Sequence, residues 1–154
     1  MELNKAQQIA QSLLNQYGLL SWNFKFNNAV RRFGLCSHTT KTISLSQHLV
    51  LLNDESQVKD TILHEIAHAL VGVGHGHDKH WVRTAKSIGC DGKRCYSSND
   101  VITPKRNYIC ICEKCNTSFE RVRKARGDVA CRSCCNKYNN GKYSKEYLLK
   151  TVAI

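Results

Sequence analysis

The sequence predicts an α+β protein in two parts: a domain of helices and strands over residues 1–102, and a basic, cysteine-rich module over residues 103–154. Three observations support this prediction. Segments with helical and with strand periodicity alternate in the first hundred residues. The only proline, Pro104, lies where the composition changes, and both CxxC pairs follow it. With 154 residues, 42% of them hydrophobic, the chain can bury a core, so wholesale disorder is not expected.

Three helices and a small antiparallel sheet account for the apolar pattern of the first part. The expected elements are a helix over 4–17, strands over 22–26, 30–36 and 41–45, and helices over 54–71 and 78–89. Trp22, Phe24 and Phe26 alternate with polar residues, which is the two-residue period of a half-buried strand. Asp54 has the short acceptor side chain that caps a helix, so we expect the longest helix to begin there.

The main chemical signal is the HEIAH segment on that long helix. His64 and His68 are four residues apart, so their imidazoles lie one turn apart on the same face and can share a metal ion. Glu65 projects beside them, where a carboxylate can take a proton from metal-bound water. A stripe of apolar residues faces nearly opposite the histidines: Val58, Ile62, Ile66, Ala69 and Val73. The helix is therefore expected to bury one side and to offer the histidine pair to a cleft.

A catalytic zinc takes three protein ligands and keeps one position open for water. Three histidines follow the motif, and spacing alone does not choose among them: His75, His77 and His80. The related pattern HExxHxxGxxH requires a histidine where this chain has Gly74, and a methionine downstream. Because the only methionine is Met1, that arrangement is disfavoured.

The segments HEIAHAL and HGHDKHW resemble the SprT-like zinc metalloproteases, relatives of Spartan. In that family a histidine followed four residues later by an aromatic residue lies on the helix after the HExxH helix. His77 and Trp81 have this spacing, so the resemblance implies that His77 is the third ligand. Gly often follows that histidine in the family, whereas Asp78 follows it here. The resemblance also implies a zincin-like fold, a C-terminal zinc ribbon and proteolysis linked to DNA, such as removal of proteins crosslinked to DNA.

The expected chemistry is metal-assisted hydrolysis. Zinc would lower the pKa of water and polarise the scissile carbonyl, while Glu65 accepts the proton and returns it to the leaving amine. Trp81 is expected to be a core aromatic that anchors the third helix and so holds His77. Tyr96 is a candidate for stabilising the oxyanion only because of its position after that helix, and a packing role is preferred for it.

The cysteine module has the spacing of a zinc ribbon. Its two CxxC pairs supply four thiolates for a closed, structural zinc site: Cys112, Cys115, Cys131 and Cys134. Cys110 could replace Cys112 and Cys135 could replace Cys134, but the CxxC spacings have the better geometry. The remaining cysteines are expected to be buried free thiols: Cys36, Cys90 and Cys95. The tail from Gly141 is not assigned to any element.

The formal charge of +11 is unevenly distributed. Residues 103–154 hold 12 Lys/Arg against 4 Asp/Glu, a net +8, whereas residues 1–102 hold 11 against 8, a net +3. A dense basic cluster between the cysteine pairs is expected to contact phosphates without reading sequence: Arg121, Arg123, Lys124 and Arg126. Four aromatic residues could stack on unpaired bases: Tyr108, Phe119, Tyr138 and Tyr143. For Phe119 and Tyr138, packing within the module is the preferred interpretation.

The sequence as a whole favours a monomeric zinc-dependent endopeptidase with one catalytic and one structural Zn²⁺, acting on DNA-associated or DNA-crosslinked proteins. Two alternatives stay open: a nucleic-acid-binding regulatory protein with a zinc site and little protease activity, and a peptidase of free proteins. No segment has the roughly 20 apolar residues of a membrane helix, and the first residues lack the apolar block of a signal peptide. We expect a cytoplasmic or nucleoid-associated protein, nuclear in a eukaryote, that is not secreted.

Overall fold

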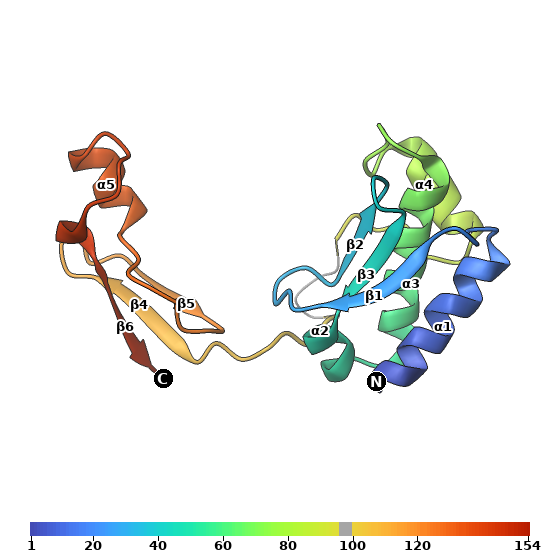
Figure 1. Ribbon diagram of the computed structural model, residues 1–154, viewed down its shortest axis with the longest axis horizontal. Helices are drawn as coiled ribbons and strands as arrows, with labels where there is room; N and C mark the ends of the chain where they lie inside the picture. Colours follow the sequence, from blue (N-terminus) through green and yellow to red (C-terminus); the bar gives the residue numbers. More distant parts are fainter. Residues whose placement is uncertain (96–99) are drawn as a thin grey trace. The chain divides into compact units, whose positions relative to one another are not determined.

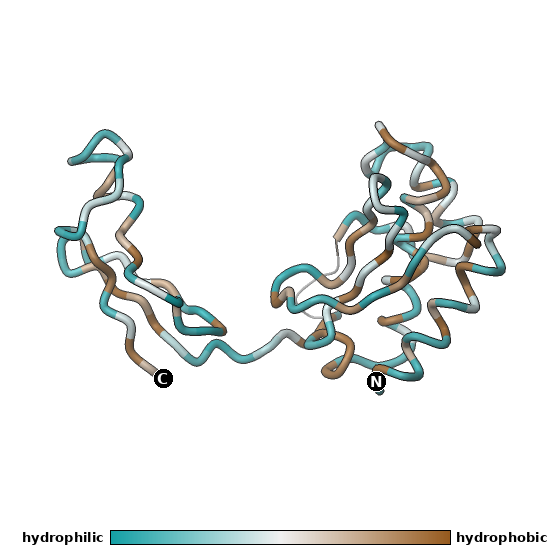
Figure 2. The backbone as a smooth tube through the Cα atoms, in the orientation of Figure 1, coloured by the Kyte–Doolittle hydropathy of each residue, from teal (hydrophilic) through white to brown (hydrophobic). Residues whose placement is uncertain are grey.

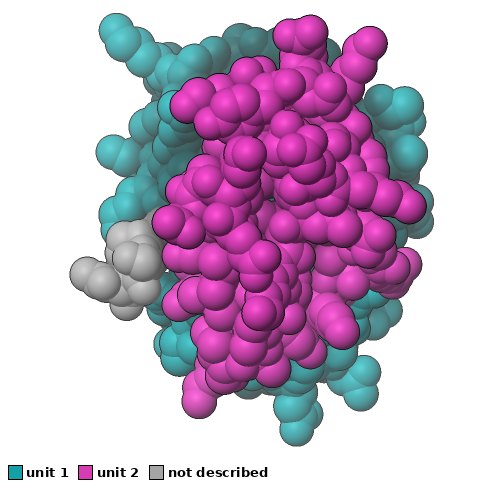
Figure 3. Space-filling view, turned by 90° about the vertical axis from the view of Figure 1, so that its left-hand side faces the viewer, with its two compact units in different colours: residues 1–104 teal, residues 105–154 magenta. Residues whose placement is uncertain are grey.

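The computed structural model describes residues 1–95 and 100–154 and consists of two compact units, Met1–Pro104 and Lys105–Ile154 (Figure 3). Both units combine helices with a three-stranded sheet, so the protein is of mixed α+β class. The first unit ends two residues later than the predicted division. Val101 is buried in its core, and Asn53 exchanges two hydrogen bonds with the backbone of Ile102, at 2.7 and 2.9 Å.

Helix α1 (Leu3–Gln16) begins the first unit and packs against α3 and β1 (Figure 1). Its apolar residues recur at helical spacing, so they fall on one side of the helix. Hydrophobic and hydrophilic positions therefore alternate along the backbone of α1 (Figure 2). The side chains that it buries are those of Ala6, Ala10, Leu13 and Leu14. They join one continuous core with the sheet and with α3.

The sheet of the first unit is mixed, which corrects the predicted antiparallel sheet. Its strands are β1 (Asn23–Asn27), β2 (Gly34–Ser37) and β3 (Thr42–Ser46), in the order β1-β3-β2. β3 pairs antiparallel with β2 but parallel with β1. The chain does not turn back after β1 as a hairpin. It crosses instead to the opposite edge, and β3 then enters between the two earlier strands, with every residue buried.

A short helix, α2 (Gln47–Leu52), was not predicted, and the described residues of the first unit therefore form four helices where three were expected. It follows β3 without a loop. The Ser46 hydroxyl, fully buried, accepts a hydrogen bond from the Leu49 backbone N–H at 3.2 Å and caps the helix. Burial of Leu49 and Val50 anchors it in the core.

The two helices that carry the chemical motif begin at aspartate caps. In α3 (Glu55–Val71), Asp54 accepts a hydrogen bond from the Gln57 N–H at 3.0 Å. In α4 (Lys79–Ser87), Asp78 accepts one from the Trp81 N–H at 2.9 Å. The prediction that Val73 continues the buried stripe is wrong, because α3 stops at Gly72 (φ 84°) and Val73 is 81% exposed.

The second unit is a sheet in the order β5-β4-β6, packed with a short helix. Its elements are β4 (Tyr108–Cys112), β5 (Ser118–Arg121), α5 (Arg132–Tyr138), the 3-10 turn η1 (Lys145–Tyr147) and β6 (Leu149–Ala153). The final segment is therefore not a mere tail, since β6 pairs antiparallel with the whole of β4 (Figure 1). None of the helices within the described residues is both long and apolar enough to cross a bilayer.

Candidate metal centres

Three histidines converge in the first unit, two from α3 and one from the loop before α4. The Nε2 atom of His77 lies 3.0 Å from that of His64 and 3.2 Å from that of His68. All three side chains are half-buried. The chain returns to α3 through the glycines at 72 and 74, whose φ values of 84° and 96° are in the left-handed region.

The other two histidines of the loop lie elsewhere. His75 Nδ1 is paired with Asp78 Oδ2 at 2.7 Å, and the rings of His75 and His80 lie 4.8 Å apart, both exposed. Of the three candidates that spacing left open, the structure thus brings His77 to the pair on α3.

The spacing of the three nitrogens fits a zinc ion. Tetrahedral ligands at about 2.0–2.1 Å from zinc are about 3.3 Å from one another, close to the separations observed here. Burial, followed by the neighbouring imidazoles, lowers the pKa of His64 and of His68 to about 4. The rings are therefore neutral at pH 7 and have a lone pair available for a metal.

Trp81 forms the floor of the histidine cluster. Its ring is fully buried, with its centroid 4.6 Å from that of His64, 5.1 Å from that of His68 and 4.5 Å from that of His77. Its indole Nε1 has no hydrogen-bond partner among the described residues. The indole thus contacts all three imidazoles and restricts their orientation.

Glu65 follows His64 on α3 and is buried, with 7% of its surface exposed. Its carboxyl group faces β2, where the Cys36 backbone donates a hydrogen bond to it. Burial raises the pKa of Glu65 to about 7, although the charge of Arg32 and the Cys36 hydrogen bond oppose this increase. A carboxyl group with this pKa can exchange a proton near neutral pH.

A hydrogen bond joins the segment after α4 to α3, one turn before His64. The Asp91 N–H donates to Asp60 Oδ1 at 2.8 Å, and the buried Cys90 thiol lies against the same carboxylate. Burial raises the pKa of the Cys90 thiol to about 12, and that of Cys36 likewise to about 12. Cys95, expected to be buried, is exposed, and Tyr96 lies outside the described residues.

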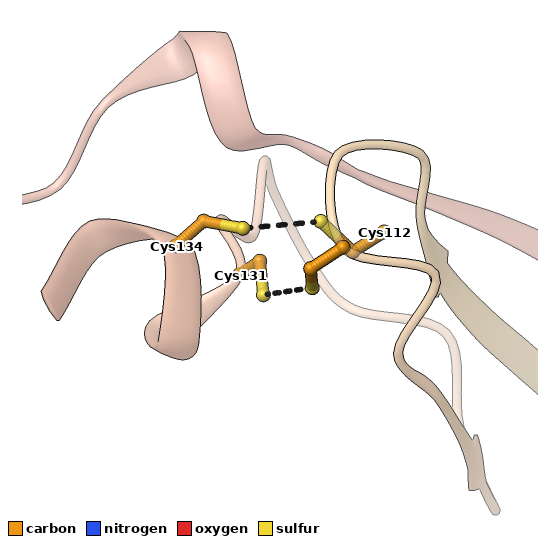
Figure 4. Close-up of side chains that lie close together, drawn as sticks. Cys112, Cys131 and Cys134 are labelled. Atoms are coloured by element: carbon orange, nitrogen blue, oxygen red, sulfur yellow. Dashed lines mark hydrogen bonds between the residues drawn. The ribbon is translucent and has the colours of Figure 1, made fainter. Parts of the chain in front are cut away.

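Four cysteines of the second unit form another cluster, at the turn after β4 and the start of α5 (Figure 4). The sulfur atoms of Cys112 and Cys134 are 3.7 Å apart, and those of Cys115 and Cys131 are 3.6 Å apart. Thiolates at about 2.3 Å from a tetrahedral zinc lie about 3.8 Å apart, so this set also fits zinc. With four protein ligands, it leaves no open position.

The two cysteines weighed as substitutes have other roles. Cys110 lies on the same face of β4 as Cys112, but its sulfur contacts Thr151 Oγ1 at 3.5 Å. Cys135 is buried in the small core of the second unit. A hydrogen bond between Cys115 and Thr117 Oγ1, 3.2 Å long, lowers the pKa of the Cys115 thiol to about 6, which favours the thiolate form that binds metal.

The basic residues predicted to contact nucleic acid lie at the end of β5 and in the loop after it. Arg121 is half-buried, whereas Arg123, Lys124 and Arg126 are exposed. The loop borders a shallow hollow of about 220 Å³ against β6.

Two aromatic residues of the second unit, which were expected to pack inside it, are exposed. Phe119 is 42% exposed and Tyr138 is 51% exposed. The Nζ atoms of Lys114 and Lys137 lie 5.5 and 5.1 Å from the Tyr138 ring centroid. The exposed ring thus has two cationic neighbours.

The fold and these two ligand clusters define an α+β protein with two candidate metal centres. The chain belongs to the SprT-like family, whose model matches residues 4–101. It is similar to a protein named "Protein SprT-like" from Staphylococcus saprophyticus, with 28% identity over 153 residues that cover 92% of this chain and 94% of that protein. A crystal structure of the metallopeptidase zymogen of Methanocaldococcus jannaschii jannalysin has a TM-score of 0.48 and 21% identity, covering 62% of this chain and 85% of that one.

Proposed function

We propose that the protein is a zinc-dependent endopeptidase with a zincin-like first unit, and that His64, His68, His77 and Glu65 form its catalytic centre. The observation that carries the proposal is the convergence of three imidazole Nε2 atoms, at 3.0 and 3.2 Å, with the buried Glu65 next to His64 on the same helix. Three ligands from the protein leave a fourth position for a reactant, as a catalytic zinc requires. Membership of the SprT-like family supports the same class of activity.

Each residue of the proposed centre has a distinct role. His64, His68 and His77 hold the ion as neutral imidazoles, and Trp81 keeps the three rings in place. A bound zinc ion supplies the Lewis acidity that activates water and polarises a peptide carbonyl. The Glu65 carboxylate accepts a proton from the attacking water and then donates it to the leaving nitrogen, so the carboxylate is regenerated after each cycle.

The cysteine cluster is proposed to hold a second, structural zinc. Its four thiolates complete a tetrahedral shell, and the surrounding core of the second unit is small. We therefore expect two zinc ions per chain, one in each unit. Sulfur and imidazole donors favour zinc over magnesium and calcium, which prefer oxygen ligands.

The proposed substrates are proteins bound or crosslinked to DNA. The support is the net charge of +8 on residues 103–154 and the cluster of Arg121, Arg123, Lys124 and Arg126. Such a cluster neutralises phosphates and concentrates the enzyme on DNA without sequence preference. The same charges would also suit a DNA-binding protein without protease activity, so the test must measure both properties.

Glu65→Gln tests the enzymatic proposal. It removes the proton acceptor and leaves the three histidines, so we expect two zinc ions per chain and loss of cleavage of casein and of a protein crosslinked to single-stranded DNA. Glu55→Gln is the matched control, because it makes the same change at an exposed position of the same helix, and it should cleave as wild type does. A wild-type protein that binds DNA and zinc but cleaves neither substrate would instead indicate the regulatory alternative.

A further inference from the structure

We infer that Gly34 is a positioning residue for Glu65: the missing side chain at this site provides the space that holds the carboxylate in its working orientation. This inference rests on the proposed function. Gly34 begins β2, is buried, and lies directly against the Glu65 side chain, which comes from α3. The two residues are distant in the sequence and meet only because β2 packs on α3.

While Glu65 keeps its present conformation, the space at Gly34 is too small for any side chain. A Cβ atom placed on Gly34 would lie 2.7 Å from Glu65 Cγ and 2.9 Å from Cδ, and nearer still to Oε1. Contacts under 3.0 Å between such atoms essentially do not occur, so something must shift. Gly34 is not among the glycines with positive φ, so the backbone conformation does not require glycine there. The requirement arises from the neighbouring carboxylate.

The strand cannot move away to relieve the contact. Gly34 pairs with Leu45 of β3, and the Phe33 carbonyl just before it accepts a hydrogen bond from the Ser46 N–H at 2.8 Å. Leu45 and Ser46 are fully buried, and Phe33 is nearly so. A displacement of β2 would therefore disturb the centre of the core.

The helix on the other side of the contact is equally fixed. Ile62 and Ile66, which flank Glu65 on α3, are fully buried. Because both backbones belong to the buried core, the Glu65 side chain is the group that can move at the lowest cost. A methyl group at position 34 would thus displace the carboxylate from its hydrogen bond with the Cys36 backbone, while the histidines on α3 would remain in place.

Gly34→Ala tests the inference through kinetics and metal content. We expect kcat for casein cleavage to fall on the order of 10- to 100-fold, because displacements of about 1 Å at a reacting group have effects of this size. KM should stay within about twofold, and the chain should still hold two zinc ions. The matched control is Gly127→Ala, since an added Cβ there meets no atom within 4 Å, the glycine has no positive φ, and it belongs to the second unit. That control should keep wild-type kcat.

A second measurement does not depend on activity. Both tryptophans, Trp22 and Trp81, belong to the first unit, so their fluorescence reports its unfolding in the full chain. With Glu65 present, Gly34→Ala should lower the unfolding midpoint. Combined with Glu65→Ala, which empties the contact, the same substitution should leave the midpoint unchanged or raise it, because alanine restricts the unfolded chain more than glycine does.

The outcomes separate this inference from the proposed function. If Gly34→Ala keeps full kcat while Glu65→Gln is inactive, the inference is wrong and the proposed function stands. Equal midpoint shifts with and without the Glu65 side chain, or failure to fold in both backgrounds, would also overturn it. If the wild-type protein cleaves nothing, the proposed function fails, and the midpoint comparison still decides whether Gly34 and Glu65 are coupled.

Discussion

At the scale of single residues, the choice between His75 and His77 decides the composition of the metal site. The two differ by two positions on a glycine-rich loop, yet one points its Nε2 at the α3 pair and the other is paired with Asp78. A residue that supplies one of three ligands cannot be removed without loss of affinity, whereas an exposed neighbour can.

His77→Ala is therefore expected to lower the zinc content from two ions per chain to one and to abolish cleavage. His75→Ala, the matched control on the same loop, should retain both ions. Inductively coupled plasma mass spectrometry of the purified proteins measures the content directly. Loss of zinc in the His75 variant instead would show that the loop rearranges when metal binds.

Residue-scale prediction from the sequence succeeds where the geometry is local. The relation between His64 and His68 is fixed by one helical turn, so the spacing alone predicts that they share a face. The contact between Gly34 and Glu65 could not be predicted in this way, because it depends on which strand packs against α3. The signal that was available is a single glycine in a strand, which often marks the close approach of another group.

At the scale of elements, the cap of α4 links helix stability to the position of His77. Asp78 accepts the Trp81 N–H and also pairs with His75, so it fixes both the start of the helix and the loop before it. The loop holds His77 between these contacts and Gly74, whose φ is 96°.

Asp78→Ala is expected to remove about 1 kcal/mol of helix stabilisation. In a unit of roughly 100 residues this lowers the unfolding midpoint by about 4–8 °C, and it should also weaken zinc binding at the histidine site. Asp54→Ala removes the equivalent cap from α3, at the end far from His64, and should lower the midpoint without changing zinc affinity. Competition with a fluorescent chelator measures that affinity, and equal affinities in both variants would contradict the link.

The elements themselves were predicted unevenly. The predicted helix over 54–71 and the observed α3 agree within a residue because a cap and an apolar stripe mark it. The predicted strand directions of the sheet were wrong. β1 pairs with β3, although β2 lies between them in the sequence, and no local signal encodes such a crossover. Helix α2 was not predicted because the residues from Leu49 to Leu52 are all apolar. Without polar residues between them, the sequence shows no helical periodicity there.

At the scale of the whole molecule, the two units are expected to differ in how far the stability of each depends on metal. The first unit has a large continuous core, whereas the core of the second consists mainly of cysteines and Tyr147. Modules of about 50 residues with so little apolar burial usually require metal or disulfides to fold.

Removal of zinc with a strong chelator is expected to unfold residues 105–154 and to leave the first unit folded but inactive. Hydrogen exchange of the full chain should show amide protection lost in β4 and β6 and retained in α1 and α3. Cys112→Ser is expected to reproduce the loss in β4 and β6 without chelator. Uniform loss of protection in both units would contradict separate dependence on metal.

Charge also acts over the whole molecule, through the basic second unit. Replacing Arg121, Arg123, Lys124 and Arg126 together with Ala should weaken binding to duplex DNA and reduce the slope of log K against log salt by up to about 3.6. A control with the same loss of charge in the first unit, at Lys25, Lys41, Lys59 and Arg83, should change the slope much less. Fluorescence anisotropy at several salt concentrations provides the slope, and equal effects of both variants would exclude a dedicated cluster.

The pairing of β6 with β4 has a consequence for the order in which the nascent chain acquires structure. The first unit is complete once residue 104 has left the ribosome, so it can fold while the second unit is still being made. β4 is synthesised early in the second unit, but its partner β6 contains residues 149–153 and emerges after β5 and α5. The sheet of the second unit therefore closes only after β6 has been synthesised, and until then the four cysteine thiols lie in a module whose β4 lacks one of its partner strands.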